Sequence, residues 1–190
     1  MESLNNIFKG CLKKDHKYQK AFYERYYGFA LKSVFRYIYR YEKAVDVTND
    51  GFIKFFNKIE QFKPGNEVDL EKMIMAYLKR IVINTAIDEL RKNKMTPEIG
   101  GIPDHVFHIA DSAENAEQKL LYKELIVFIK ELSPQYRAVF NLYVIDGYNH
   151  MEIADILQIP VGTSKSCLSR ARGILEGKIK KYEEEVQCRI

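Results

Sequence analysis

Short hydroxyl side chains and cations are interspersed between residues 163 and 172, and this composition suits the binding of nucleic acid. In a helix that enters a DNA groove, hydroxyls and backbone amides near the N-terminus bind phosphates and base edges. Arginine can in addition bind guanine through two parallel hydrogen bonds. The outward-facing residues expected in this segment are Thr163, Lys165, Ser166, Ser169, Arg170 and Arg172. Their chemistry indicates contact with a DNA major groove.

Two helices separated by a short turn are needed to present these residues, and the sequence predicts both. Asn149, with Glu152 three residues later, has the pattern of a capping box at the start of the first helix. The sequence Gln158-Ile159-Pro160 interrupts that helix, and a second helix is expected from about Val161. The small Ala154 and the short turn favour a helix-turn-helix over a plain helical hairpin with a solvated face. The residues expected to face inward are Ile153, Ala154, Leu157, Leu168, Ala171 and Leu175.

A second polar group lies in the run from Ala76 to Lys92. Asn84 follows the aliphatic residues Ile81-Val82-Ile83, and its amide has both donors and an acceptor. Such an amide can hydrogen-bond the edge of a base turned out of the stack. Asn84 is also suited to cap a following helix, and both interpretations stay open here. The neighbouring cations placed for phosphates are Arg80, Arg91, Lys92 and Lys94.

A third polar group is formed by Asp46, Asn49 and Asp50, which lie one helical turn apart and therefore share a face. Paired carboxylates can be catalytic, but no His or other metal-ligand partner accompanies these residues in the sequence. A polar face that binds basic residues of a partner protein is the better interpretation.

Helical periodicity dominates the chain, and no segment alternates as a strand does. Thirteen of the 24 Phe and Tyr residues lie between Phe22 and Phe62, which is enough to build a core in a small first domain. Ser133 followed by Pro134 predicts another helix start. We predict an all-α fold of two small helical domains, 1–95 and 118–190, joined by a flexible acidic linker over 96–117. Helices are expected in 17–41, 46–62, 69–81, 83–90, 121–132 and 134–147.

Charge is distributed unevenly along the chain. Residues 1–94 hold 19 basic and 12 acidic side chains, whereas residues 95–117 hold five acids and no Lys or Arg. Residues 160–181 hold six basic side chains and one acid. Two basic bodies on either side of an acidic strip suggest a polyanionic partner contacted at two places. Ordinary solvated helix faces are the alternative interpretation.

Other classes of protein are disfavoured. The longest apolar stretch, Met73 to Leu78, is too short to span a membrane, and residues 1–6 do not resemble a signal peptide. The three widely spaced cysteines fit a reducing, cytoplasmic location. No phosphate-binding glycine loop or nucleophile motif of an enzyme is present. A metal cluster would have only a weak set of ligands in the linker, namely Asp104, His105, His108 and Asp111.

Three motifs, in order, resemble bacterial sigma factors of the extracytoplasmic-function (ECF) group over nearly the whole chain. Residues 146–157 with 160–166 resemble the promoter-reading helix-turn-helix of that family. Residues 76–92 resemble the segment that melts and reads the −10 element, and residues 46–52 resemble the helix that binds the clamp coiled coil of the polymerase. In the family, a linker at the position of 96–117 threads the RNA-exit region of the polymerase.

The resemblance implies a sigma factor that directs promoter-specific transcription initiation, with no enzyme activity, cofactor or metal of its own. Its implied partners are core RNA polymerase, duplex −35 DNA and the single-stranded −10 element, and an anti-sigma partner is left open. The residues implied for core polymerase binding are Asp46, Asn49, Asp50 and Phe52. Those implied for the −10 element are Lys79, Arg80, Asn84, Thr85, Asp88, Arg91 and Lys92. Those implied for the −35 element are Thr163, Ser164, Lys165, Ser166, Ser169, Arg170 and Arg172.

Four residues depart from the family pattern around the turn and the second helix. Gln158 stands where a turn Gly is common, Pro160 where a hydroxyl cap is usual, Ser164 where a core Val is usual, and Cys167 where an Arg is usual. An alternative function is a helix-turn-helix regulator whose N-terminal helical domain senses a ligand or dimerises, and a helical adaptor is a third class. Co-purification with core RNA polymerase distinguishes a sigma factor from both.

Overall fold

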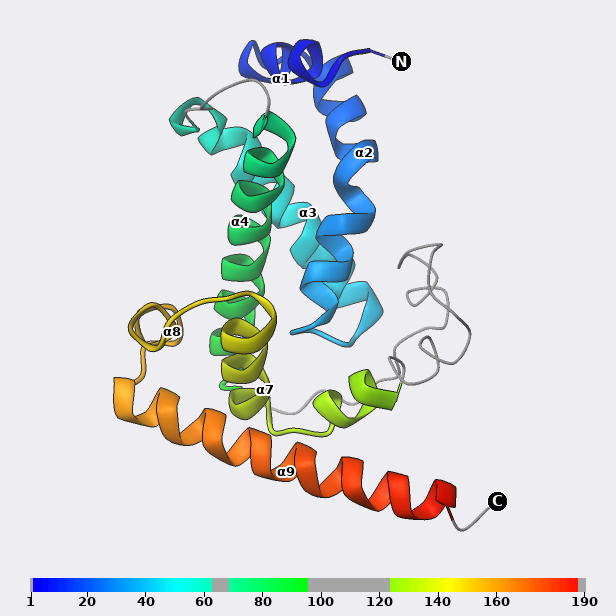
Figure 1. Ribbon diagram of the computed structural model, residues 1–190. Helices are drawn as coiled ribbons and strands as arrows, with labels where there is room; N and C mark the ends of the chain where they lie inside the picture. Colours follow the sequence, from blue (N-terminus) through cyan, green and yellow to red (C-terminus); the bar gives the residue numbers. More distant parts are fainter. Residues whose placement is uncertain (1, 63–68, 96–123, 188–190) are drawn as a thin grey trace. The chain divides into compact units, whose positions relative to one another are not determined.

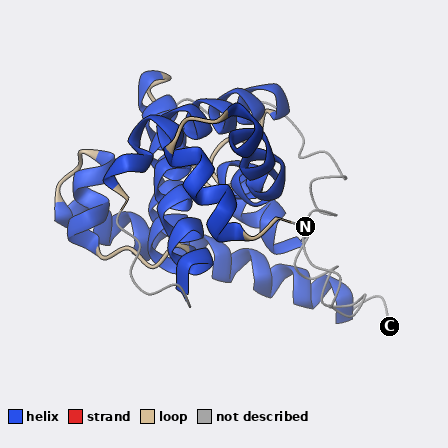
Figure 2. Cartoon of the chain, turned by 90° about the horizontal axis from the view of Figure 1, so that it is seen from above, coloured by secondary structure: helices blue, strands red, loops and turns tan. Residues whose placement is uncertain are grey.

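The computed structural model describes residues 2–62, 69–95 and 124–187, and all regular structure among them is helical (Figure 1; Figure 2). These residues fall into two compact units, one of 2–62 with 69–89 and the other of 90–95 with 124–187. The prediction of an all-α fold is confirmed. The predicted linker 96–117 and its weak metal-ligand set lie outside the described residues. None of the described helices is both long enough and apolar enough to cross a lipid bilayer.

The described residues of the first unit form four α-helices and a short 3-10 turn. The elements are α1 Leu4–Leu12, α2 His16–Phe35, α3 Tyr41–Lys58, η1 Ile59–Gln61 and α4 Leu70–Lys92, whose last three residues belong to the second unit. Four of these helices differ from the prediction. Helix α2 ends at Phe35 rather than at residue 41, and α3 begins at Tyr41 rather than at residue 46. Helix α1 was not expected, and the two helices expected over 69–81 and 83–90 are one continuous helix, α4.

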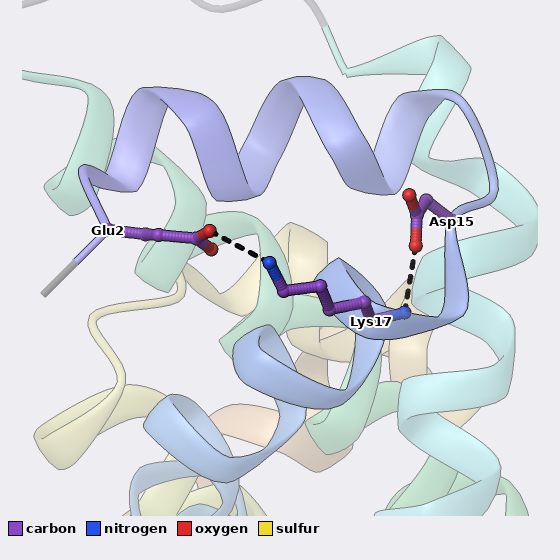
Figure 3. Close-up of polar contacts among 3 residues, drawn as sticks. All are labelled: Glu2, Asp15 and Lys17. Carbon is purple, nitrogen blue, oxygen red and sulfur yellow. Dashed lines mark hydrogen bonds and ion pairs between the residues drawn. The ribbon is translucent and has the colours of Figure 1, made fainter.

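The turn between α1 and α2 is closed by polar contacts (Figure 3). The carboxylate of Asp15 accepts a 2.9 Å hydrogen bond from the backbone N–H of Lys17, which caps the start of α2. The Lys17 ammonium in turn pairs with Glu2, at 3.1 Å from Oε1. Gly10 lies at the tightest point, because a Cβ there would be 2.2 Å from the ring of Tyr18. These contacts hold α1 against the first turns of α2.

Aromatic side chains from α2 and α3 form the core of the first unit. The rings of Phe22 and Phe55 stack with centroids 4.7 Å apart, and Phe22 also packs on Tyr26 at 4.7 Å. Phe52 is buried in the same group, at 6.4 Å from Phe22 in an edge-to-face arrangement. Aromatic pairs of this kind add to the stability that burial provides. The predicted aromatic core is therefore confirmed.

Helix α4 crosses α3 closely at Gly51. A Cβ at this position would be 2.7 Å from Cγ1 of Val82, a distance that real side chains do not adopt. Only glycine permits the two backbones to approach this far without repacking. The half-buried Tyr77 of α4 packs its ring on Phe55 and Phe62.

The N-terminal end of α4 is joined to α2 by a small polar network. The Arg25 guanidinium donates a 2.7 Å hydrogen bond to Glu71 Oε1, and the Tyr26 hydroxyl donates to the same oxygen at 3.3 Å. The hydrogen bond from Arg25 lowers the pKa of the Glu71 carboxyl. Burial, with the Glu71 charge as a second cause, raises the pKa of Tyr26 to about 12.

The second unit is built around a long C-terminal helix. Residues 124–130 are helical, and then follow α7 Pro134–Phe140, the π-helical turn η3 Asn141–Ile145, α8 His150–Leu157 and α9 Val161–Gln187. Leu132, Ala171 and Leu175 form a buried cluster on which Phe128, Ile129, Tyr136 and Phe140 pack.

Local signals in the second unit are confirmed by the helix ends. The Ser133 hydroxyl accepts from the N–H of Tyr136, with Pro134 in the first turn of α7. Asn149 and Glu152 form a complete capping box at the start of α8. Gln158 ends α8 in the left-handed region at φ 53°, a conformation that glycine adopts with less strain. The turn thus has the geometry of the family pattern with a larger residue in the place of the usual Gly.

Candidate nucleic-acid interface

Helices α8 and α9 form the predicted helix-turn-helix. Ile153, Ala154 and Leu157 of α8 are buried, and Leu168, Ala171 and Leu175 of α9 are buried as well, so the inward residues are those expected. On the opposite side of α9, Thr163 is half-buried and the others are exposed: Lys165, Ser166, Ser169, Arg170 and Arg172. One helix therefore presents hydroxyls and cations to solvent while its other side fills the core.

Ser164 is an exception, and its assignment to the −35 contacts is wrong for this structure. Its side chain is fully buried, and its Oγ lies 2.9 Å from Nδ1 of His150. Position 164 therefore lies on the core side of α9, where the family pattern has a Val. The His150 ring stacks on Tyr143 of η3 with centroids 4.6 Å apart. Ser164 thus joins α9 to α8 through a polar contact instead of an apolar one.

Two tyrosines contact the two arginines on α9. Nη1 of Arg170 donates a 3.2 Å hydrogen bond to the hydroxyl of Tyr136, which raises the pKa of Arg170. The guanidinium carbon of Arg172 lies 5.8 Å from the centre of the Tyr143 ring, within the range of a cation–π interaction. Neither tyrosine was predicted as a functional residue, although both lie in the helix expected over 134–147.

On α4, some of the residues assigned to the −10 element share a face. Arg80, Asn84, Asp88 and Arg91 follow one another at four- and three-residue steps, which places them along one side of the helix. Lys79 and Lys92 each point about 100° away from a neighbour in this row, because each is one residue removed from it. Thr85 is buried, and its hydroxyl bonds the carbonyl of Ile81 at 2.8 Å. The assignment of Thr85 as a contact to the −10 element is therefore wrong for this structure.

Asn84 lies in the middle of α4, so it cannot be the N-cap of a following helix. That interpretation is wrong because the helix continues through it to Lys92. The side chain is half-buried, and its Oδ1 is shielded from solvent with no hydrogen-bond partner among the described residues. An amide in this state is rare, because a buried unpaired polar atom is destabilising.

Two acids near Asn84 pair with cations of α3. Lys54 lies 3.7 Å from Asp88 Oδ2, and Lys43 lies 2.8 Å from Glu89 Oε1. Asp88 was assigned to the −10 element, and in the structure its carboxylate lies beside a cation of the neighbouring helix. Both ion pairs connect the C-terminal half of α4 to α3. Each is expected to contribute little to the free energy of unfolding, because the paired side chains are partly exposed.

The polar face of α3 has one member that the sequence analysis missed. Asp46 and Asp50 are exposed and Asn49 is half-buried, while Ile53, one turn further on, is 58% exposed. Residues 49 and 50 lie three or four positions from both 46 and 53, and this helical spacing could have identified Ile53 as part of the face. Phe52, in contrast, is buried in the aromatic core, so its assignment as a direct polymerase contact is wrong for this structure.

The described residues offer little support for a metal site or for a reactive cysteine. They contain no group of three or more His, Cys, Asp or Glu residues placed to bind a metal ion. Cys11 and Cys167 are buried, and burial raises the pKa of both thiols, that of Cys11 to about 11. Buried thiols with raised pKa values are poor nucleophiles. Cys188 lies outside the described residues.

The described residues form two all-helical units, the second of which carries a helix-turn-helix. Residues 22–96 match sigma-70 region 2, and residues 122–175 match sigma-70 region 4. The chain belongs to the family of ECF RNA polymerase sigma factors. It is therefore a sigma factor, the component that binds core RNA polymerase and directs promoter-specific transcription initiation.

Curated relatives establish the family. The ECF RNA polymerase sigma-E factor of Haemophilus influenzae is 31% identical over 181 residues, which cover 87% of this chain and 89% of that protein. The ECF sigma factor SigW of Bacillus subtilis is 30% identical over 156 residues, covering 77% and 80%. The sigma factor RpoE of Bartonella quintana, solved in complex with the anti-sigma factor NepR, has a similar fold with a TM-score of 0.52. That match is 23% identical and covers 85% of this chain and 98% of that one.

Proposed function

We propose that this sigma factor reads duplex DNA of the −35 element with the N-terminal half of α9. The observation that supports this proposal is the division of α9 into a buried apolar side and an exposed side of hydroxyls and cations. A second helix of a helix-turn-helix enters the major groove with such a face. Ser166 and Ser169 are small, so the helix backbone can approach the base edges while the cations at Lys165, Arg170 and Arg172 bind phosphates or guanine.

The −10 element is proposed to bind the α4 face of Arg80, Asn84, Asp88 and Arg91. Capture of a base turned out of the stack needs donors and acceptors for its edge. The Oδ1 of Asn84 has no hydrogen-bond partner within the described residues, and a rotation of this half-buried side chain toward solvent would offer it to a base as an acceptor. Arg80 and Arg91, four residues before and seven residues after Asn84, are placed to bind the phosphates of the same strand.

Core polymerase is proposed to bind the face of α3 that carries Asp46, Asn49, Asp50 and Ile53. Two exposed carboxylates and an exposed aliphatic side chain suit a partner helix with basic residues and an apolar contact. A protein that acts with RNA polymerase works in the cytoplasm, and we propose that location. Regulation by an anti-sigma factor stays a prediction from the family.

The −35 assignment is tested by binding of the full chain, with core polymerase, to a −35 duplex across a salt series. Lys165→Ala and Arg170→Ala are the test variants, and Lys181→Ala, which removes a cation paired with Glu185 on the same helix, is the control. Loss of a phosphate contact weakens all sequences and lowers the salt slope by about 1, whereas loss of a base contact costs about 1–3 kcal/mol at one position. Unchanged affinity and slope for both test variants would exclude α9 from the interface.

A further inference from the structure

Two tyrosines of the second unit contact the two arginines of α9, one through a hydrogen bond and one through its ring. We propose that Tyr136 and Tyr143 are positioning residues that hold Arg170 and Arg172 ready for promoter DNA. This inference rests on the proposed role of α9. The contacts that carry it are the 3.2 Å hydrogen bond from Arg170 to the Tyr136 hydroxyl and the 5.8 Å approach of Arg172 to the Tyr143 ring.

The arginines lie at the two edges of the exposed face of α9. Residues two apart in an α-helix point about 160° away from each other, so Arg170 and Arg172 border the face on opposite sides. Ser166 and Ser169 lie between them, and both are exposed. A guanidinium at each edge can reach a phosphate beside the groove or a base within it. Both uses need the long side chain to extend in one particular direction.

An unrestrained arginine loses rotational freedom when it binds, and this loss weakens the affinity. A side chain that is already held in the free protein loses less. Arg170 gives one N–H to Tyr136 and keeps four of its five donors for DNA, while a cation–π contact leaves all five donors of Arg172 available. The tyrosines therefore restrict the arginines without using up the groups that recognise phosphate or guanine.

Tyr136 is itself fixed by the core. Its ring packs on the buried cluster of Leu132, Ala171 and Leu175, and its backbone N–H is bound by the capping hydroxyl of Ser133. Only the edge of the ring with its hydroxyl reaches Arg170. A Phe at this position keeps the packing and removes the hydroxyl that accepts from Arg170, so the variant isolates the positioning effect.

Tyr143 is fixed through the turn of the helix-turn-helix. Its ring stacks on His150 at 4.6 Å and 27°, and His150 lies 2.9 Å from the buried hydroxyl of Ser164. Contacts therefore run from Arg172 to Tyr143 on η3, to His150 on α8, and back to Ser164 on α9. Because this path is closed, the packing of α8 on α9 and the position of Arg172 are coupled. The path also gives the buried Ser164 a part in recognition without contact to DNA.

The test uses the full chain with core polymerase and measures affinity for a −35 duplex at several salt concentrations. Tyr136→Phe removes the hydroxyl, Tyr143→Leu removes the ring, and Tyr143→Phe restores the ring. Tyr182→Phe is the matched control, because Tyr182 lies on α9 and packs on Phe128. Each tyrosine variant is also made in the background in which its own arginine is Ala.

Tyr136→Phe and Tyr143→Leu are each expected to weaken binding about twofold to tenfold, and Tyr143→Phe to restore it. Neither loss should be seen once Arg170 or Arg172, respectively, has been replaced by Ala. Equal losses with and without the arginine, in step with a lower melting temperature, would overturn the inference and leave the role of α9 intact. No effect of Arg170→Ala and Arg172→Ala on affinity or salt slope would instead overturn the role of α9 itself.

Discussion

The hydroxyl of Tyr23 on α2 donates a 2.9 Å hydrogen bond to Oδ1 of Asn49 on α3. The Tyr23 ring is held by Phe52, with centroids 4.8 Å apart, and by Tyr27 at 5.0 Å. Because the carbonyl oxygen of Asn49 is bound inside the unit, its amide N–H groups on the other side of the planar group are left for a partner. The orientation of a residue on the proposed polymerase-binding face is thus set by a neighbouring helix.

Tyr23→Phe should weaken binding to core polymerase by about 0.5–1.5 kcal/mol, the usual contribution of one hydrogen bond. The expected reason is that Asn49 loses its fixed orientation while the ring packing remains. Competition with a labelled sigma factor for core polymerase measures the effect, and Tyr18→Phe on the same helix, where the ring packs beside Gly10, serves as the control. A normal affinity for Tyr23→Phe, together with a weakened Asn49→Ala, would show that the amide needs no orientation.

Asp50→Arg should prevent assembly with core polymerase and leave the fold intact. Asp50 is exposed on α3, so the change reverses a charge on the proposed binding face without disturbing the core. Co-elution with core polymerase measures assembly, and circular dichroism checks the fold. Glu24→Arg, which reverses an exposed acid on α2, is the matched control. Assembly at the normal level would place the docking face elsewhere.

Asn84→Ala should lower activity without lowering stability. Ala is a better helix former than Asn by about 0.5 kcal/mol, and the change removes a buried unpaired oxygen, so the free energy of unfolding should stay the same or rise. Open-complex formation should fall on linear duplex and much less on a template already melted around −10, because only the duplex requires a base to be captured. Equal activity losses on the two templates would remove Asn84 from base capture.

Gly51→Ala should destabilise the first unit by about 1–3 kcal/mol, because the new Cβ overlaps Val82 at the crossing of α3 and α4. Val82→Ala in the same chain should recover part of this loss by making room. Gly177→Ala on α9 is the contrasting control, since a Cβ there meets no atom within 4 Å and should stabilise the helix by about 0.5–1 kcal/mol. Chemical denaturation of the three variants measures these differences, and equal effects at both glycines would contradict the close approach.

Stability should fall in alkaline solution as Tyr26 ionises. Its folded pKa of about 12 lies above the ordinary value of 10, so the protonated form is favoured by folding. The contribution is complete below pH 10 and is lost between pH 10 and 12, with a slope of at most about 1.4 kcal/mol per pH unit. Cys11, raised from 9 to about 11, contributes to the lower part of the same range. Tyr26→Phe should flatten the upper part in denaturation measured from pH 8 to 12, and an unchanged curve would contradict the assignment.

Features that depend on local interactions could be predicted from the sequence. The capping box of Asn149 and Glu152, the start of α7 at Ser133 and the inward row of α9 each depend on neighbours within one or two turns. The continuity of α4 could not be predicted. Its buried side widens toward the C-terminus, where Val82, Ile83, Ala86 and Ile87 are all enclosed, so the apolar stripe changes face as it would at the start of a new helix.

Side-chain contacts between different helices could not be predicted from the sequence pattern. Nothing in the spacing of Ser164 and His150, or of Tyr136 and Arg170, relates the two members of each pair. The short helix α1 is a different case, because its signal is local: Ser3 caps its start, and apolar residues recur at helical steps at Leu4, Ile7, Phe8, Cys11 and Leu12. The family pattern placed a core residue at 164, but the polar partner of the serine there follows only from the tertiary structure.

The length of α4 sets a measurable footprint. An α-helix rises 1.5 Å per residue, so the row from Arg80 to Arg91 is about 16 Å long. Stacked nucleotides of one strand are spaced about 3.4 Å apart, and the row therefore spans about five of them. Because α4 is one helix without a break, this span cannot be stretched by a hinge within the row. The number of promoter positions read by this face is thus limited by a helix length, whichever bases are preferred.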